Sequence, residues 1–317
     1  IAIKSSQNTQ MLASSNPKFI PQIVLLNDDI EHSSGFTSPW VDWVINPAPN
    51  VTHDDYVQRF PHVQTLLGPG YAYLRPEFSE VKYIPLQQRT GILIMLGGSD
   101  VKNLSAPLAK AIATILPGIP ITLVLGAATK WDDTLSQTIT EQFPQITVYQ
   151  NTSKIPELMM QSGLAITAAG GTLGELAAMG VPTIALVIAD NQVAALANEH
   201  EGKWYKAFDF REYNVVEDKS EQPFSVDVFS SVTASEKAIS SETASAETLS
   251  QASAVMVPTM AELNSTVATS TESSVPQTAK TLWYDLCKRK EMSTYARQLI
   301  DTKGCQRIML NIGHTQT

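Results

Sequence analysis

A short run of small residues offers a place where phosphate oxygens can meet the backbone of this chain. The stretch AAGGT, positions 168–172, stands between an apolar run typical of a strand and a run typical of a helix. Because glycine has no side chain, a diphosphate can approach the N–H groups of Gly170 and Gly171, where a helix start favours negative charge. Two alternatives stay open: a tight turn without a ligand, and a capping box formed by Thr172 and Glu175.

A second loop of the same kind, LGGSD, occupies positions 96–100, again between a strand-like and a helix-like stretch. Gly97 and Gly98 offer backbone amides and Ser99 offers a hydroxyl, so the two loops together favour phosphate binding more than either alone. Neither loop has the GxGxxG or GxxxxGK(S/T) pattern, which disfavours dinucleotide oxidoreductases and P-loop NTPases.

A third polar cluster, Asp190, Asn191 and Gln192, follows the apolar stretch VPTIALVI. Three hydrogen-bonding side chains at the end of a strand suit sugar hydroxyls or an N-acyl group. Asp190 or Asn191 could equally begin the next helix as its N-cap, and the sequence does not decide between the two roles.

The elements that must position these loops alternate from about Gly91 to Asp190. Short apolar runs such as GILIML and PITLVLGA are separated by amphipathic helical stretches, with expected helices at about 132–143 and 154–161. This β-α alternation predicts a doubly wound parallel sheet with helices on both faces. Ligands of such sheets bind outside the carboxyl ends of the strands, where all three polar loops would lie.

The rest of the chain is uneven. The stretches IPQIVLLNDD and VDWVINPAP indicate further buried strands, but this half is short for a complete α/β domain. Between Gly202 and Gly304 there is no glycine, and Ser, Thr, Ala and Glu dominate from 217 to 278. We therefore expect a partial amino-terminal domain (1–85), a nucleotide-binding domain (86–216), a Ser/Thr-rich insertion without a fold of its own (217–278), and terminal helices that complete the fold (279–317), with Gly304 as a helix stop.

Composition excludes several classes. The chain of 317 residues carries 22 Lys and Arg against 31 Asp and Glu, a net charge of −9, which disfavours nucleic acid and anionic membranes as partners. Apolar runs are too short for a membrane span, and the opening residues lack the pattern of a signal peptide. Cys287 and Cys305 lie outside any CxxC pattern, so we expect a reducing, cytoplasmic location and neither disulfide nor zinc. The missing initial Met suggests a fragment.

Three blocks carry a family resemblance. GILIMLGGSDVKNL, NTSKIPELMMQSGLAITAAGGTLGELAAMGVPTIALVIADNQ and YARQLIDTKGCQRI resemble the carboxyl half of the PseG family, and LLGPGYAYLRPEF resembles the end of its amino-terminal domain. These are UDP-sugar hydrolases of pseudaminic acid biosynthesis, related to MurG-like glycosyltransferases of the GT-B fold. The resemblance covers about 23–205 and 282–312, and the second block departs slightly by reading LGGSD.

The resemblance implies a GT-B-like fold and specific roles. By position, Gly170, Gly171 and Thr172 would hold the diphosphate and Glu175 the ribose hydroxyls. The loop at Lys154 and Ile155 would lie beside the uracil through backbone atoms. The remaining positions would line the phosphate and sugar side: Gly97, Gly98, Ser99, Asp190, Asn191 and Gln192.

The resemblance also marks a gap at the catalytic centre. The family carries a GxGHxxR-type loop near the amino terminus whose histidine activates water, and here His32, His53 and His62 stand outside any GxGH pattern. A general base must reach its water within about 3 Å, so no catalytic residue is assigned. Asp28 and Asp29 follow a strand-like stretch and match an acidic position of the family, either facing the cleft or forming a turn or helix cap.

The leading hypothesis is a UDP-sugar hydrolase of the PseG type, represented by a chain without its catalytic loop. Water would attack the anomeric carbon and UDP would leave, with no metal and no cofactor required by any motif. The alternatives are a GT-B glycosyltransferase of polysaccharide synthesis, and a catalytically inactive nucleotide-sugar-binding protein whose Ser/Thr-rich insertion recruits a protein partner.

Overall fold

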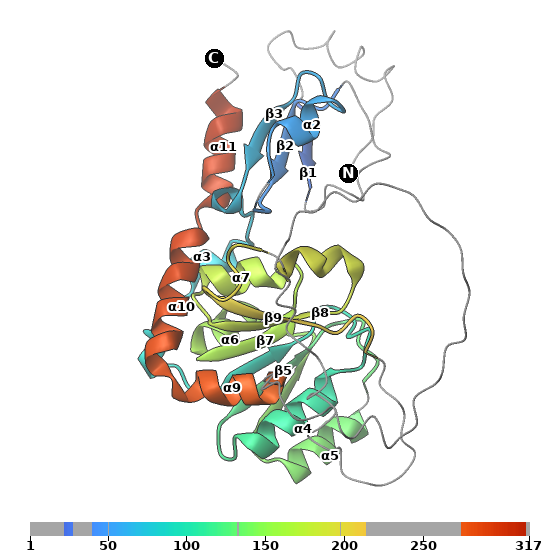
Figure 1. Ribbon diagram of the computed structural model, residues 1–317, viewed down its shortest axis with the longest axis vertical. Coiled ribbons are helices and arrows are strands. Elements are labelled where there is room, and N and C mark those ends of the chain that lie inside the picture. Colours follow the sequence, from blue (N-terminus) through green and yellow to red (C-terminus); the bar gives the residue numbers. More distant parts are fainter. Residues whose placement is uncertain are drawn as a thin grey trace, which may run out of the picture.

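The computed structural model describes residues 22–27, 40–49, 51–131, 133–196, 198–213 and 274–314. Asp28, Asp29 and most of the expected insertion lie outside these ranges. Within them the strands form two parallel sheets, a smaller sheet of β1–β3 and a larger sheet of β4–β9 (Figure 1). The strands are β1 (Val24–Leu26), β2 (Trp43–Asn46), β3 (Gln64–Leu67), β4 (Ile92–Met95), β5 (Ile121–Leu125), β6 (Ile146–Gln150), β7 (Leu164–Ala168), β8 (Thr183–Val187) and β9 (Tyr205–Asp209).

Helices connect the strands in the order that the sequence predicts. The described α-helices are α2 (Asp54–Val57), α3 (Glu77–Glu80), α4 (Ser105–Ile115), α5 (Asp133–Gln142), α6 (Ile155–Gln161), α7 (Thr172–Ala178), α9 (Val275–Tyr284), α10 (Leu286–Leu299) and α11 (Gly304–His314). Three short 3₁₀ helices are described as well: η1 (Pro69–Tyr71), η2 (Leu86–Gln88) and η3 (Asp190–Ala195).

The larger sheet has the strand order β6-β5-β4-β7-β8-β9, with every pair parallel. The chain moves outward from β4 to β6, returns to the centre at β7, and moves outward the other way to β9. Right-handed crossovers in opposite directions place their helices on opposite faces. Accordingly, α4 and α5 lie on one side of the sheet and α7 on the other (Figure 1). The doubly wound parallel α/β fold is confirmed, and its pairing with a second parallel unit is GT-B-like.

The core of the larger sheet explains why its strands are apolar throughout. All residues of β7 and β8 are buried, including Leu164, Ile166 and Ile184 at 0% exposure. A strand covered on both faces needs apolar residues at every position instead of alternating ones. Each fully buried leucine or isoleucine contributes roughly 1.5–3 kcal/mol relative to an exposed one.

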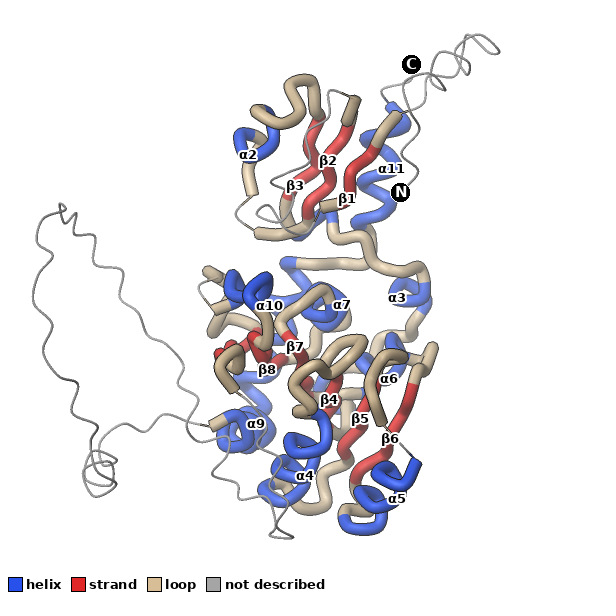
Figure 2. Tube along the Cα trace, turned by 90° about the vertical axis from the view of Figure 1, so that its right-hand side faces the viewer, coloured by secondary structure: helices blue, strands red, loops and turns tan. Residues whose placement is uncertain are grey.

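The smaller sheet is covered by elements from opposite ends of the chain. On one face, Tyr56 and Phe60 of the α2 region pack against Val44. On the other face, Ile308 of α11 packs against Trp43 and Leu66. Figure 2 shows α11 beside β1–β3 and apart from the larger sheet. The last described helix therefore completes the first unit.

The terminal helices correct two boundaries. Helix α9 begins at Val275, inside the stretch expected to remain an unfolded insertion up to 278, with Ser274 as its N-cap accepting a hydrogen bond from the Gln277 N–H. Gly304 does not stop a helix, because α10 ends at Leu299 and Gly304 begins α11. A Cβ at this position would overlap the carbonyl oxygen of Ala72, so glycine permits the close approach of α11 to the segment between β3 and β4 that joins the two units.

Candidate functional site

The reversal of strand order places the candidate site. β4 and β7 are neighbours, and the chain leaves them toward opposite edges of the sheet. In open α/β sheets, ligands bind outside the carboxyl ends of the strands at such a switch point. The loop 96–100 follows β4 and the loop 169–171 follows β7. Both predicted phosphate loops therefore follow neighbouring strands at the same switch point.

The loop after β7 presents open backbone donors. Gly170 and Gly171 are exposed, and a Cβ on Gly171 would meet nothing within 4 Å. Gly170 donates its N–H to the Ala168 carbonyl, whereas in the described part of the chain the Gly171 and Thr172 N–H groups donate to no backbone acceptor. Unpaired backbone donors in an accessible loop are suited to an anionic ligand.

Glu175 has a different local role from the capping box considered above. The N-cap of α7 is Gly171, and no side chain caps this helix, so the capping-box alternative is wrong. The Glu175 carboxylate instead accepts from Nη2 of Arg75 at 3.4 Å, with the Glu175 side chain 22% exposed. Burial raises the pKa of Glu175, and Arg75 opposes this shift.

The loop after β4 owes its shape to glycine and to a buried acid. Gly97 has φ +80°, a backbone conformation that favours glycine. Gly98 lies so close to Gly126, at the end of β5, that a Cβ on Gly126 would overlap the Gly98 backbone. Asp100, at φ +42°, is buried and accepts from the N–H groups of Leu104 (3.0 Å) and Ser105 (2.9 Å) at the start of α4. Ser99, between Gly98 and Asp100, is exposed.

The three polar residues after β8, Asp190, Asn191 and Gln192, lie in different surroundings. Ala189 is the N-cap of η3 without a side-chain cap, so the N-cap alternative for Asp190 and Asn191 is wrong. Gln192 turns toward the Gly170 loop: its Oε1 accepts from the Ile188 N–H at 3.0 Å, and its Nε2 lies 3.8 Å from where a Gly170 Cβ would stand. Asn191 is exposed beside it.

Asp190 pairs with an arginine that the sequence analysis did not single out. Arg211 Nη1 donates to Asp190 at 3.1 Å, while Arg211 Nε and Nη2 donate to Asp209 at 3.0 and 2.7 Å. These hydrogen bonds lower the pKa of Asp209. Lys102, from the loop after β4, donates to the Arg211 carbonyl at 2.6 Å. The ends of β4, β8 and β9 are thereby tied together, a link that no sequence spacing reveals.

Ile155 is not beside the glycine loops. It begins α6 after β6, and β5 and β4 separate β6 from β7. Its half-buried side chain packs against the main core. If Ile155 contacts the uracil base, it would do so through its backbone atoms, at the far end of the same edge of the sheet.

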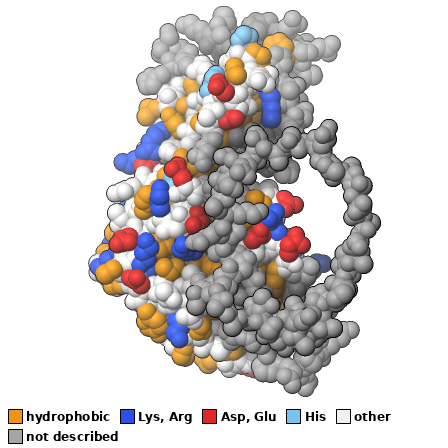
Figure 3. Space-filling view, viewed as in Figure 1, with side chains coloured by type: hydrophobic (Ala, Val, Ile, Leu, Met, Phe, Trp, Pro, Cys, Tyr) orange, Lys and Arg blue, Asp and Glu red, His pale blue; other side chains and the backbone are white. Residues whose placement is uncertain are grey.

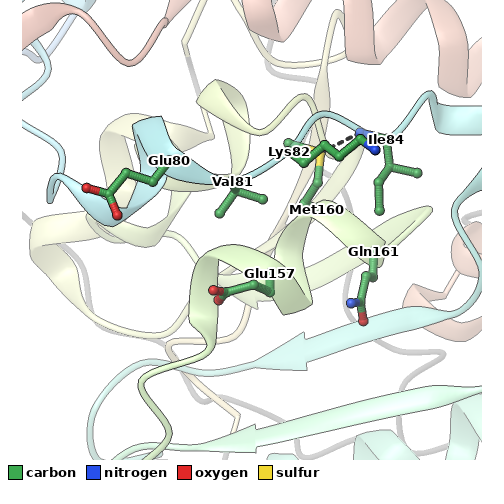
Figure 4. A pocket seen from close by; sticks show the side chains of 7 residues that line it. All are labelled: Glu80, Val81, Lys82, Ile84, Glu157, Met160 and Gln161. Atoms are coloured by element: carbon green, nitrogen blue, oxygen red, sulfur yellow. Dashed lines mark hydrogen bonds between the residues drawn. The ribbon is translucent and has the colours of Figure 1, made fainter.

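Three described histidines and the described cavity lie away from these loops, and His32 lies outside the described residues. His53 contacts Thr65 at 3.3 Å in the first unit, His62 is exposed there, and His200 is buried against the Tyr295 hydroxyl at 3.0 Å. An open cavity of about 290 Å³ lies between the joining segment and α6 (Figure 4), where the Ile84 N–H donates to Met160 Sδ at 3.3 Å. Its lining residues are Glu80, Val81, Lys82, Ile84, Glu157, Met160 and Gln161. None of these belongs to the three loops.

The surface in Figure 3 carries acidic and basic side chains interspersed, without a large field of one sign on the face in view. In the described ranges, no group of three or more His, Cys, Asp or Glu side chains is placed to hold a metal ion. No helix in the same ranges is both long and apolar enough to cross a bilayer.

Comparison with known proteins gives partial matches. No family model matches the chain. It is 31% identical over 170 residues to the spore coat polysaccharide biosynthesis protein SpsG of Bacillus subtilis, covering 52% of this chain and 49% of SpsG. It is 32% identical over 126 residues to an uncharacterized protein of Methanocaldococcus jannaschii, covering 38% of this chain and 26% of that protein. The chain thus matches half or less of these relatives' length.

Among solved structures, MurG of Acinetobacter baumannii superposes with a TM-score of 0.44 at 15% identity, covering 92% of this chain and 67% of that one.

Proposed function

We propose that the unit built on the larger sheet binds a UDP-sugar at the switch point between β4 and β7. We also propose that the protein releases UDP from this UDP-sugar, in the biosynthesis of a surface polysaccharide or of a nonulosonic acid such as pseudaminic acid. The observation that carries the proposal is the pair of glycine loops that follow the neighbouring strands β4 and β7. Unpaired amides at Gly171 and Thr172 are suited to the diphosphate. Glu175, one turn further along α7, is the candidate for the ribose hydroxyls.

The reaction proposed is hydrolysis. The oxygen of a water molecule would attack the anomeric carbon, and the bond from that carbon to the diphosphate oxygen would break, so that UDP leaves with the electron pair. The proton lost by water passes to a general base, for which no described residue is proposed. Backbone N–H groups of the Gly170 loop would stabilise the negative charge that develops on the departing diphosphate.

The named relative supports the biological setting. SpsG is a spore coat polysaccharide biosynthesis protein, and its match covers about half of this chain. The sequence blocks of the PseG resemblance include both glycine loops and the cluster 190–192. All three segments follow neighbouring strands of the larger sheet, and this arrangement supports the ligand class that the resemblance implies.

Calorimetric titration of the 317-residue chain with UDP tests the binding site. We expect Glu175→Ala to weaken UDP binding by about 1–3 kcal/mol, because charged hydrogen bonds to the ribose are lost. Glu157→Ala is the matched control: this glutamate on α6 is exposed and lines the separate cavity, so its loss should leave the affinity unchanged. A folded chain that gives no binding heat with UDP would contradict the proposal.

A second experiment separates the reaction classes. UDP-sugars are incubated with the protein, with and without candidate acceptor sugars, and free UDP is measured. A hydrolase releases UDP at the same rate in both samples. A glycosyltransferase releases it only with the acceptor, and that result would refute hydrolysis. Since no general base is assigned in this chain, a lack of release in both samples would favour the inactive nucleotide-sugar-binding protein.

A further inference from the structure

Arg75 joins the segment between the two units to the candidate ribose residue. It lies between η1 and α3, on the stretch of chain that leads from β3 to β4. Its Nη2 lies 3.4 Å from Oε1 of Glu175, one hundred positions later in the sequence. Its guanidinium carbon also stands 5.2 Å from the centre of the Phe78 ring, and Phe78 is 1% exposed in the main core. The arginine thus rests on a fixed ring while it faces the carboxylate.

The backbone on the amino-terminal side of Arg75 is held by α11. Cys305 Sγ donates to the Leu74 carbonyl at 3.4 Å, and Arg307 Nη1 donates to the Gly70 carbonyl at 2.8 Å. Arg307 is itself paired with Asp301 at 2.6 Å. Arg75 therefore extends from a backbone that two hydrogen bonds from α11 restrain, so less backbone freedom is lost when Arg75 faces the carboxylate.

We propose that Arg75 is a positioning residue for nucleotide recognition: it holds the Glu175 carboxylate in the orientation that accepts hydrogen bonds from the ribose hydroxyls. This inference rests on the proposed UDP site and extends it to the segment that joins the two units. Neither the spacing of the sequence nor the family resemblance assigned Arg75 a role.

Charge gives the reason for such a residue. A carboxylate that accepts from ribose must be ionised, and the partial burial of Glu175 favours its neutral form. In the described part of the chain, Arg75 is the charged group that acts against this effect. Without Arg75, Glu175 would bind a proton at higher pH, and ribose recognition would fall as the solution becomes more acidic.

The test uses UDP and its 2′,3′-dideoxy analogue, titrated into the full chain and four variants from about pH 8 to about pH 5. We expect Arg75→Ala to weaken UDP binding about two- to fivefold at neutral pH, a modest effect because the ion pair of Arg75 and Glu175 is partly exposed. The loss of affinity should be larger at acidic pH, where Glu175 without Arg75 binds a proton. Arg75→Lys should restore most of the affinity. Glu175→Gln should weaken UDP binding by itself, and adding Arg75→Ala to it should cause no further loss. The dideoxy analogue should bind the unaltered chain and Arg75→Ala equally.

The outcomes are distinguishable. Equal weakening of UDP and of the dideoxy analogue by Arg75→Ala, or a loss that does not change with pH, would overturn the positioning role and leave the UDP site standing. Failure of the unaltered, folded chain to bind UDP would overturn the proposed function together with this inference.

Discussion

Replacement of Gly304 by alanine should weaken the packing of α11 against Ala72, on the segment that joins the two units. A Cβ at this position would overlap the Ala72 carbonyl oxygen and would stand 2.8 Å from the Ala72 carbonyl carbon and 3.0 Å from its nitrogen. These are backbone atoms, so no flexible side chain can yield. Overpacking of this kind costs about 1–3 kcal/mol. The gain in helix propensity offsets less than about 1 kcal/mol of it, because position 304 is the first residue of the helix.

Thermal unfolding of Gly304→Ala and of Gly313→Ala measures the effect with a control in the same helix. A Cβ on Gly313 would meet nothing within 4 Å, so that substitution should be neutral or raise stability by up to about 0.5–1 kcal/mol. We expect Gly304→Ala to lower the midpoint by about 2–4 °C for each kcal/mol lost. If Gly304→Ala proves as stable as the unaltered chain, the inferred close contact with Ala72 is wrong.

Two further substitutions probe the site edge. Gly126→Ala should lower the free energy of unfolding by about 1–3 kcal/mol and also weaken UDP binding, because its Cβ would displace the Gly98 backbone. Urea unfolding measures the first effect and calorimetry the second. If the variant keeps its affinity for UDP, no ligand binds at the loop that contains Gly98. Asp209 has a lowered pKa because of its hydrogen bonds to Arg211, so its contribution to stability is present above about pH 4 and is lost as the pH falls through the lowered value. Urea unfolding from about pH 5 to about pH 2 should therefore show a smaller loss in Asp209→Asn than in the unaltered chain, and equal losses would refute the pairing.

Local sequence predicted the larger sheet because its signals are local. Apolar runs of strand length, each followed by glycine and a helical pattern, identify β4 and β7 and the loops after them. The shared edge then follows from the parallel geometry. The helices expected near 132–143 and 154–161 agree with α5 and α6 to within one residue at every end.

Side-chain partners could not be predicted in the same way. Thr172 and Glu175 fit a capping box, but Gly171 takes the N-cap and Glu175 faces Arg75. Asp190 fits an N-cap, but Ala189 is the N-cap of η3, and the Asp190 carboxylate accepts a hydrogen bond from the charged Arg211 side chain. In both cases a local pattern competes with a charged partner distant in the sequence, and only the folded arrangement decides between them. The sequence also does not predict that α11 packs on the smaller sheet, because the pattern of an amphipathic helix does not show which sheet the helix covers.

The position of α11 has a consequence for synthesis on the ribosome. One face of the smaller sheet receives Ile308 of α11 only after the larger sheet, which lies between them in the sequence, has been made. Until then Trp43, Ile45 and Leu66 would be exposed in the nascent chain, although β2 and β3 can already pair. Domains usually fold in the order of synthesis. Here the smaller sheet must wait for α11, which is made after the larger sheet, whereas most of the larger sheet can assemble before α11 is made.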